Sequence, residues 1–389
     1  MKRLLICCDG TWNRPDSEHI TNVEKIARTV QTDPRATGGA YQLVYYLSGV
    51  GGAGYKTDRI LGGAFGFGLF HNVLAGYRFL AQNYEPGDEI FIIGFSRGAY
   101  TARSLAGMVA RVGLLTKAAL VEEKLPQAVT EYQRKDPLAG ASGASLAEFR
   151  RDNCHPDAPV HFLGVFDTVG ALGVPGAMRL APKFHDVQLG AGVLCARQAL
   201  AIDETRLKFA PNLWEGADEA TDDPRVKQVW FEGAHSDVGG GYGQTGLSDS
   251  ALLWMAKEAH AAGLVFDTAL LSHYVASGSS AIRHNPLKPL FKVLNAILTL
   301  KMKLGRGDRA SFSKGLRRLS SERALSVRIS STAVTHYREG GYAPANLVTL
   351  AGATNDFEGL VEEVVALPEK GLDISELGSP PRQDVVHAG

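Results

Sequence analysis

The segment EIFIIGFSRGAY, residues 89–100, constrains the fold of this chain more than any other. Residues 89–95 form a nearly continuous apolar run, which is typical of a strand buried on both faces of a parallel sheet. A helical pattern follows, and the junction reads Gly-x-Ser-x-Gly through Gly94, Ser96 and Gly98. The glycines let strand and helix approach closely, so the sharp turn exposes the serine hydroxyl. The segment predicts a nucleophilic serine on an α/β scaffold; an ordinary glycine-rich turn is the alternative.

Strand and helix patterns alternate along the first two thirds of the chain. This alternation favours an α/β fold with a mostly parallel central sheet flanked by helices. Together with the Gly-x-Ser-x-Gly turn, it indicates an α/β-hydrolase-like fold with helical insertions or a cap. Besides 89–95, strands are predicted at 3–8, 42–47, 160–166 and 226–233, and helices at 60–83, 97–112 and 248–262.

The organisation of the 389 residues follows from where these patterns weaken. We expect a catalytic domain over 1–265, with polar insertions at about 114–158 and 171–224 lying over the sheet edge. Residues 266–367 are expected to be a helical or cap region that completes the same domain. The proline-containing tail 368–389 is expected to be loosely ordered.

Two candidate partners for the serine follow the later strands. Asp167 directly follows VHFLGVF, and His235 lies just beyond VWFEG. A serine alcohol is a weak nucleophile that needs a base, and the base needs an acid to orient it. Ser96, Asp167 and His235 have the chain order that α/β-hydrolases use for nucleophile, acid and base. Alternatively, Asp167 caps a helix and His235 is a structural loop residue, while Asp237 either bonds within its loop or helps to orient His235.

Donors for a developing oxyanion are expected at two turns. The N–H of Arg97 stands at the predicted helix start, directly after the serine. The stretch CCDGTWN follows the first strand, so the N–H groups of Gly10 or Thr11 are expected to face the same pocket, with Asp9 bracing the turn. A turn without any catalytic part is the alternative. A phosphatase of the D-x-D-x-T kind is set aside because Cys7 stands where its nucleophilic aspartate would be.

A glycine-rich stretch after the fifth predicted strand raises a rival function. Gly241, Gly243 and Gly246 fit the G-x-G-x-x-G fingerprint of dinucleotide-binding proteins, and Asp267 follows at a suitable distance. However, the predicted strand ends too far before the first glycine for a tight turn. The glycines are interpreted instead as allowing the backbone that carries His235 to pass close to the site.

Composition excludes several kinds of function. Lysine plus arginine and aspartate plus glutamate are equal at 41 each, so no net field attracts nucleic acid. The four cysteines contain no C-x-x-C pair and are interpreted as buried thiols in a reducing compartment. The first apolar run is too short for a signal peptide, and no segment reaches the length of a spanning helix. We therefore expect no metal, no cofactor, and a protein that is cytoplasmic or exported without a signal peptide.

The motifs together resemble the α/β-hydrolase domain of unknown function 2235, which includes the catalytic part of type VI secretion lipase effectors of the first class. The resemblance implies a triad of Ser96, Asp167 and His235, ester hydrolysis and phospholipase activity, and a delivery or immunity protein as partner if the chain is secreted. Gln198 stands where many members have a histidine, which leaves that position open. The matching pieces, over about residues 4–245, are CCDGTWN, YYLSGVG, GFSRGAYTARSLAGM, FLGVFDTVGALG, ALAIDETRLKFAPNLW and VWFEGAHSDVGGGY.

Two further segments have two interpretations each. Asp203, Glu204 and Arg206 form either a solvated or ion-paired helix face or a site for a polar head group. Residues 287–304 carry lysines at both ends, many apolar residues and no acidic residue. They form either a helix packed on the core or an interfacial helix that contacts an anionic membrane.

Three functions therefore compete. The first is a serine ester hydrolase that acts on lipid or phospholipid acyl esters. The second is a catalytically silent interaction module that keeps the fold, and the third is a dinucleotide-binding oxidoreductase. A complete set of serine, acid and histidine favours the first.

Overall fold

The computed structural model describes residues 1–10, 17–49, 62–134, 142–169, 189–215, 223–275, 282–303, 311–313, 315–319 and 326–364. Thr11, the first part of the expected insertion 171–224 and the expected loose tail 368–389 lie outside these residues.

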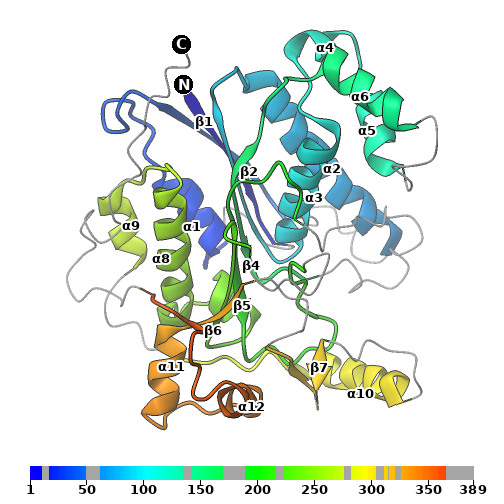
Figure 1. The fold of residues 1–389 in the computed structure, drawn as a ribbon. Helices are drawn as coiled ribbons and strands as arrows, with labels where there is room; N and C mark the ends of the chain where they lie inside the picture. Colours follow the sequence, from blue (N-terminus) through cyan, green and yellow to red (C-terminus); the bar gives the residue numbers. More distant parts are fainter. Residues whose placement is uncertain are drawn as a thin grey trace.

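An eight-stranded sheet forms the centre of the molecule, and every neighbouring pair of its strands is parallel. The α/β-hydrolase-like fold class is therefore confirmed, and each strand predicted from an apolar run is present. Figure 1 shows the sheet edge-on between its helices. In sheet order the strands are β10 (Val361–Glu362), β9 (Val327–Ser330), β6 (Val226–Phe231), β5 (Ala196–Ala201), β4 (Val160–Phe166), β3 (Glu89–Phe95), β1 (Lys2–Cys8) and β2 (Tyr41–Leu47).

Strands β5, β9 and β10 were not predicted. β5 lies within the range 171–224 that the sequence assigns to an insertion over the sheet edge, but it occupies the middle of the sheet between β4 and β6. Its sequence ARQALA has no β-branched or aromatic residue, so burial rather than propensity makes it a strand. Gln198 lies on this strand, fully buried, with its amide donating to the Asn212 carbonyl oxygen at 3.1 Å. β9 and β10 show that the range 266–367 supplies strands as well as helices.

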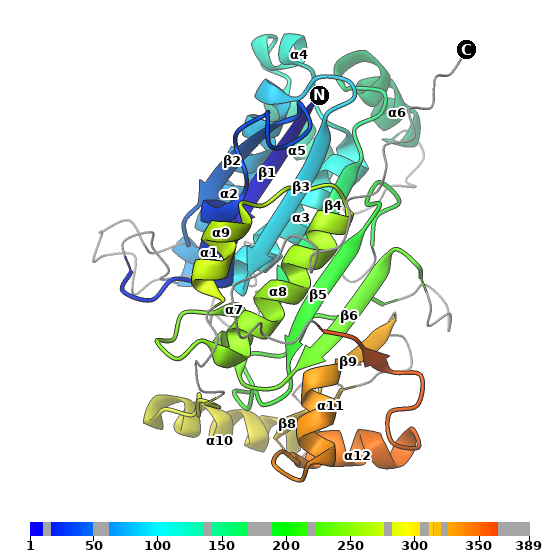
Figure 2. The ribbon, with the colours of Figure 1, turned by 90° about the vertical axis from the view of Figure 1, so that its left-hand side faces the viewer.

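Helices cover both faces of the sheet (Figure 2). The amphipathic helices α2 and α3 pack on one face, while α1, α8 and α9 pack on the other. A third apolar cluster joins β9 to α11 and α12. The helices of the two faces are α1 (Asn22–Thr29), α2 (Gly62–Asn83), α3 (Arg97–Val112), α8 (Gly246–Ala261) and α9 (Thr268–Tyr274), with α11 (Ser331–Arg338) and α12 (Ala345–Ala353) beside β9.

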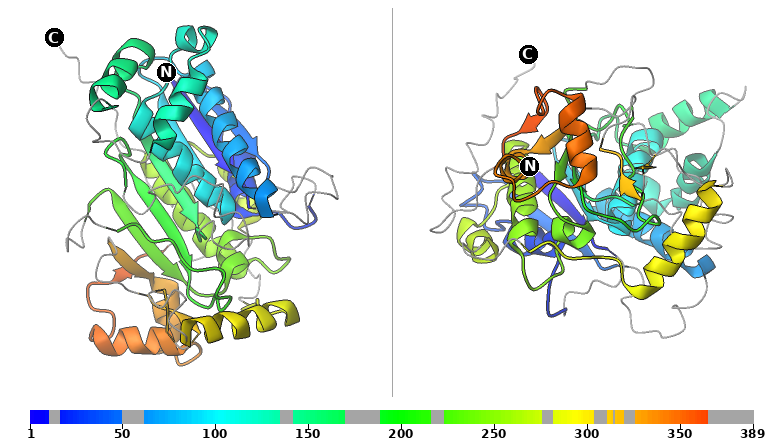
Figure 3. Two further views of the ribbon diagram at one scale, coloured as in Figure 1. Left: turned by 90° about the vertical axis from the view of Figure 1, so that its right-hand side faces the viewer. Right: turned by 90° about the horizontal axis from the view of Figure 1, so that it is seen from below.

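The remaining elements lie at opposite ends of the sheet. The helices of the expected insertion 114–158 sit where β1 begins, far from the strands' carboxyl ends (Figure 2). At the other end, α10 runs across the base of the molecule, as the view from below in Figure 3 shows. The elements are α4 (Lys117–Val121), α5 (Leu125–Gln133) and α6 (Ser142–Asn153) at the first end, and α7 (His235–Gly239), α10 (Pro289–Lys303), β7 (Phe312–Ser313) and β8 (Leu316–Arg317) at the second.

Candidate active site

Ser96 occupies the turn between β3 and α3. Its φ of 58° and ψ of −120° form a strained conformation for a residue with a side chain. The flanking glycines make the turn possible, because a Cβ on Gly98 would lie 2.1 Å from the Cys8 carbonyl oxygen. A Cβ on Gly94 would lie 2.6 Å from the Gly98 carbonyl oxygen. The close approach predicted for these glycines therefore holds the serine at the end of the sheet.

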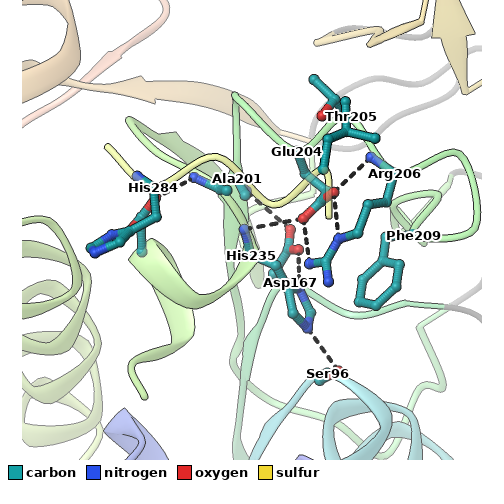
Figure 4. A network of polar contacts seen from close by, with 12 residues as sticks. Ser96, Asp167, Ala201, Glu204, Thr205, Arg206, Phe209, His235 and His284 are labelled. Carbon is teal, nitrogen blue, oxygen red and sulfur yellow. Dashed lines mark hydrogen bonds and ion pairs between the residues drawn. The ribbon is translucent and has the colours of Figure 1, made fainter. Parts of the chain in front are cut away.

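Three side chains predicted to act together lie in one hydrogen-bonded chain (Figure 4). Ser96 Oγ is 2.8 Å from Nε2 of His235, and Nδ1 of the same ring is 2.5 Å from Oδ2 of Asp167. Asp167 directly follows β4, and His235 opens α7 just beyond β6. Because the carboxyl ends of parallel strands meet at one edge of the sheet, residues far apart in the chain come together here.

The surroundings of the Ser96–His235–Asp167 hydrogen bonds favour a histidine that is neutral before any reaction. Burial lowers the pKa of His235 below its ordinary value, although the contact with Asp167 opposes this shift. Burial alone would raise the pKa of Asp167, but the charge of Arg317 and the bond to His235 hold it well below its usual range. At neutral pH the imidazole is therefore uncharged and the carboxylate is ionised.

Aromatic rings enclose His235. The Phe95 ring lies 4.6 Å from the imidazole, and the Phe209 ring meets it edge-on at 5.0 Å. These contacts remove water from two sides of the ring, so its rotamer is fixed by packing as well as by hydrogen bonds. Neither phenylalanine was predicted as part of the site, although Phe95 stands next to the serine in sequence.

Arg317 is a charged residue of this site that sequence reasoning also missed. It lies on β8, is fully buried, and pairs with both carboxylate oxygens of Asp167, at 2.6 Å and 3.1 Å. It also donates to the carbonyl oxygens of Ala201 and Phe209. No motif marks this arginine, because its partner lies 150 residues away in the sequence.

The group Asp203, Glu204 and Arg206 lies beside His235. Glu204 and Arg206 are ion-paired, as one interpretation of the sequence had it, but the group lies on a turn and the loop after it rather than on a solvated helix face. Glu204 is fully buried and binds the Arg206 guanidinium at 2.7 Å and 2.9 Å. The backbone N–H of His235 donates to Glu204 at 3.4 Å. Asp203 accepts bonds from the Gly233 N–H and the Tyr342 hydroxyl. The group therefore fixes the backbone around the histidine.

Asp237 points away from His235. Its Oδ1 is 2.6 Å from Nδ1 of His284, while its Oδ2 accepts the N–H groups of Ala234 and His284. The Tyr242 ring stacks on His284 with a centroid distance of 3.9 Å. Of the two roles that the sequence left open for Asp237, neither describes its contacts fully: it accepts the nearby Ala234 N–H, but its side-chain partner is the distant His284 and not His235.

The dinucleotide alternative does not fit this geometry. The first glycine of the fingerprint must form a tight turn directly after a strand. Here α7 lies between β6 and Gly241, so the glycines follow a helical turn. Asp267, the expected ribose ligand, instead caps α9 by accepting the Leu270 N–H at 3.1 Å.

The stretch after β1 lies against the serine turn, because Cys8 pairs with Gly94 across the sheet. Asp9 is buried and accepts bonds from the hydroxyls of Thr21 and Tyr46, at 2.7 Å and 2.6 Å. These contacts fit the expected brace. The Gly10 N–H donates to the Asp9 carboxylate at 2.6 Å and is therefore engaged within the turn.

Arg97 begins α3 directly after the serine, which places its N–H in the first turn of the helix. Burial lowers the pKa of its guanidinium to about 10. Among the described residues, no group of three or more histidine, cysteine or acidic side chains is arranged to hold a metal ion. Within the same residues, every helix is too short or too polar to cross a membrane.

Comparison with known families gives one match over most of the chain. The family described as the catalytic domain of Tle1-like phospholipase effectors of the type VI secretion system matches residues 2–258. This range holds Ser96, Asp167 and His235, whereas Arg317, His284 and α10 lie beyond it.

The chain is also similar to individual proteins, at low identity or over part of their length. An uncharacterized protein of Saccharomyces cerevisiae is 32% identical over 230 residues, which cover 54% of this chain and 32% of that protein. The chain thus matches about a third of the yeast protein's length. The structure of the Tle1 effector bound to the VgrG spike of the type VI secretion system has a TM-score of 0.45 at 16% identity, covering 81% of this chain and 82% of that one. An uncharacterized protein from Pseudomonas aeruginosa has a TM-score of 0.39 at 18% identity, covering 68% and 46%.

Proposed function

We propose that this chain is a serine hydrolase of lipid or phospholipid acyl esters. The proposal starts from the family: the chain belongs to the Tle1-like catalytic domains of type VI secretion phospholipase effectors. The observation that carries the proposal is the chain of hydrogen bonds from Ser96 through His235 to Asp167. A serine, a base and an acid in this order and at these distances are the parts that acyl transfer needs.

In the proposed reaction, Ser96 Oγ attacks the ester carbonyl carbon while Nε2 of His235 takes the hydroxyl proton. Asp167 holds the resulting imidazolium and keeps its Nδ1–H oriented. Collapse of the tetrahedral intermediate breaks the ester bond, and His235 gives the proton to the leaving alcohol. Water, deprotonated by the same ring, then cleaves the acyl-enzyme and releases the fatty acid.

Two backbone N–H groups are the oxyanion donors of the proposed reaction. We assign the first donor to the Arg97 N–H, because it stands at the start of α3 where the helix dipole favours negative charge. We assign the second donor to the N–H of Gly10 or Thr11. For Gly10, this role requires its bond to the Asp9 carboxylate to open when substrate binds.

A fluorophosphonate probe tests the proposed chemistry, since it reacts with activated serines. We expect one covalent adduct, located on Ser96 by peptide mass spectrometry, and none in Ser96→Ala. Ser104, which is buried in α3, offers a matched control variant, and Ser104→Ala should label like the parent. A folded wild-type chain that stays unlabelled would favour the catalytically silent module instead.

Helix α10 supports a lipid substrate, because its two sides differ. Its inner side is fixed over the site: the amide of Asn295 bonds to the Thr205 carbonyl at 2.8 Å and accepts the Leu207 N–H at 3.0 Å. The Phe291 ring lies 5.1 Å from the Arg206 guanidinium. Its outer side exposes an apolar row at helical spacing, namely Val293, Ile297 and Leu300, at 60%, 48% and 59%.

We infer that this outer side rests on an anionic lipid surface. Lys288 and Lys292 are exposed at the start of the helix, and residues 287–304 contain no acidic residue. Surface lysines contribute about 1 kcal/mol each to the attraction of such a surface. The helix would then hold the site near the membrane that supplies the substrate. If the chain is exported, a delivery spike and an immunity protein are further partners to test.

Liposome binding tests this role of α10. Lys288→Gln combined with Lys292→Gln should weaken binding to anionic vesicles by about 30-fold at low salt, because two attractive charges worth about 1 kcal/mol each are lost. Hydrolysis of a soluble short-chain ester should be nearly unchanged. Lys117→Gln with Lys124→Gln makes the same charge change at the opposite end of the molecule and should bind like the parent. Equal losses in both double variants would contradict an oriented contact.

A further inference from the structure

Two side chains donate hydrogen bonds to the Asp167 carboxylate: the imidazole of His235 and the guanidinium of Arg317. His235 Nδ1 contacts Oδ2, and the Arg317 guanidinium spans both oxygens of the carboxylate. The Ala201 N–H completes the set with a bond to Oδ1 at 3.0 Å. The arginine and the aspartate are both 0% exposed. The carboxylate is therefore held in one plane from three sides.

This arrangement is difficult to explain by stability alone. A buried arginine gives up its hydration, and the ion pair it forms is often no more stabilising than apolar side chains of similar volume. The Nε–H of Arg317 is buried and has no hydrogen-bond partner among the described residues. A buried donor without a partner weakens the fold, so its presence beside the proposed acid points to a role in the reaction.

We propose that Arg317 is a positioning residue, which fixes the plane of the Asp167 carboxylate and sets the pH above which His235 acts as a base. The inference rests on the proposed function, because it assigns the arginine to the same hydrogen-bonded chain. The bidentate contact leaves Oδ2 facing Nδ1 of the histidine, so the imidazole can present Nε2 to Ser96 in one orientation only.

The effect on basicity follows from charge. An ionised carboxylate next to a histidine stabilises the imidazolium, and a second cation on that carboxylate offsets part of the stabilisation. Other charged groups near His235 are Glu204, which raises its pKa, and Arg206, which lowers it. These two pair with each other, whereas Arg317 acts through Asp167. Removal of Arg317 should therefore raise the pKa of His235 and keep the base protonated to higher pH.

The arginine is supplied by a part of the chain beyond the matched catalytic range. β8 pairs with β7 in a small two-stranded sheet. Asn346 of α12 then ties β8 to the main sheet, because its amide donates to the carbonyl oxygens of both Arg317 and Ile202. The C-terminal segments 311–313, 315–319 and 326–364 thus help to complete the site that the family range begins.

Substitution of Arg317 in the full-length chain tests the inference. We would measure the pH profile of kcat/KM for a soluble p-nitrophenyl ester. Arg317→Met should move the acidic limb up by about one pH unit and lower kcat by about ten-fold or more, with KM little changed. Arg317→Lys keeps the charge but not the bidentate contact, so its acidic limb should stay near that of the wild type while kcat falls. Arg318→Met, at the exposed neighbouring arginine, is the control and should match the parent.

A second measurement separates this inference from the proposed function. An NMR titration of the His235 imidazole needs no substrate, and it should show the same upward shift in Arg317→Met. A wild type that neither labels nor hydrolyses esters would contradict the proposed function, while the titration would still decide the role of the arginine. If Arg317→Met does not fold, the Arg317→Lys variant tests the positioning role instead. A wild-type kcat in Arg317→Lys would overturn that role. A folded Arg317→Met with an unshifted titration and an unshifted limb would overturn the effect on basicity.

Discussion

Two aspartate–histidine pairs lie at the carboxyl end of the sheet, and they are nearly identical in local geometry. Asp167 contacts His235 at 2.5 Å, and Asp237 contacts His284 at 2.6 Å, each through Nδ1. Their surroundings differ. The Asp167–His235 pair is buried, and its second ring nitrogen faces Ser96 Oγ. The ring of His284 is 23% exposed and stacks on Tyr242.

The comparison shows that the pair itself does not define a catalytic site. Nε2 of His284 lies 3.2 Å from Oε1 of Gln244, an amide oxygen that cannot act as a nucleophile. Oδ2 of Asp237 accepts the backbone N–H groups of Ala234, just before α7, and of His284, so this pair joins two segments of chain. Asp167 instead pairs with a buried cation, the Arg317 guanidinium. We conclude that contacts with Ser96, the proposed nucleophile, and with Arg317 distinguish the two pairs.

The largest expected difference is between the two histidines. His235→Ala should lower kcat/KM for a soluble ester by about 10⁴-fold or more, because the base is lost and the remaining members of the set act only as a unit. His284→Ala should leave kcat nearly unchanged. It should instead lower the free energy of unfolding by about 1–3 kcal/mol, because the buried Asp237 carboxylate loses a partner. Steady-state kinetics and chemical denaturation of both variants measure the two effects, and comparable kinetic losses would remove the distinction.

A smaller difference is expected between the two acids. Asp167→Asn should reduce kcat by about 10²- to 10⁴-fold, since the imidazole then loses the acceptor that orients it. Asp237→Asn keeps the size of the side chain and should have a mainly structural effect, seen as a lower midpoint of thermal unfolding. The same kinetic assay with thermal unfolding of each variant makes the comparison. Greater kinetic damage in Asp237→Asn would mean that the acid has been assigned to the wrong pair.

The parts of the site that the sequence could predict share one property. Ser96, Asp167 and His235 each follow a strand with a strong apolar pattern, and parallel topology brings the ends of such strands together. The local sequence patterns were therefore sufficient to predict that these three residues lie near one another. The ambiguity over Asp237 could not be resolved in this way, because its partner His284 lies in a loop without a pattern.

The parts that could not be predicted depend on tertiary contacts. β5 reads as a helical or mixed segment because alanines dominate it, yet its position between β4 and β6 overrides this preference. Arg317 belongs to a two-residue strand, which is too short to leave a periodic signal. Its importance arises from a contact with Asp167 that nothing in the local sequence encodes.

The place of β9 in the sheet has a consequence for how this protein is made. β6 pairs with β5 on one side and with β9 on the other, and almost 100 residues separate β6 from β9. A nascent chain that has passed β6 therefore has an open strand edge, flanked by Trp230 and Phe231, until residues 327–330 leave the ribosome. Open apolar edges pair readily with other chains. Translation that stalls within this interval should yield an aggregating fragment, which makes the last quarter of the chain a determinant of soluble expression.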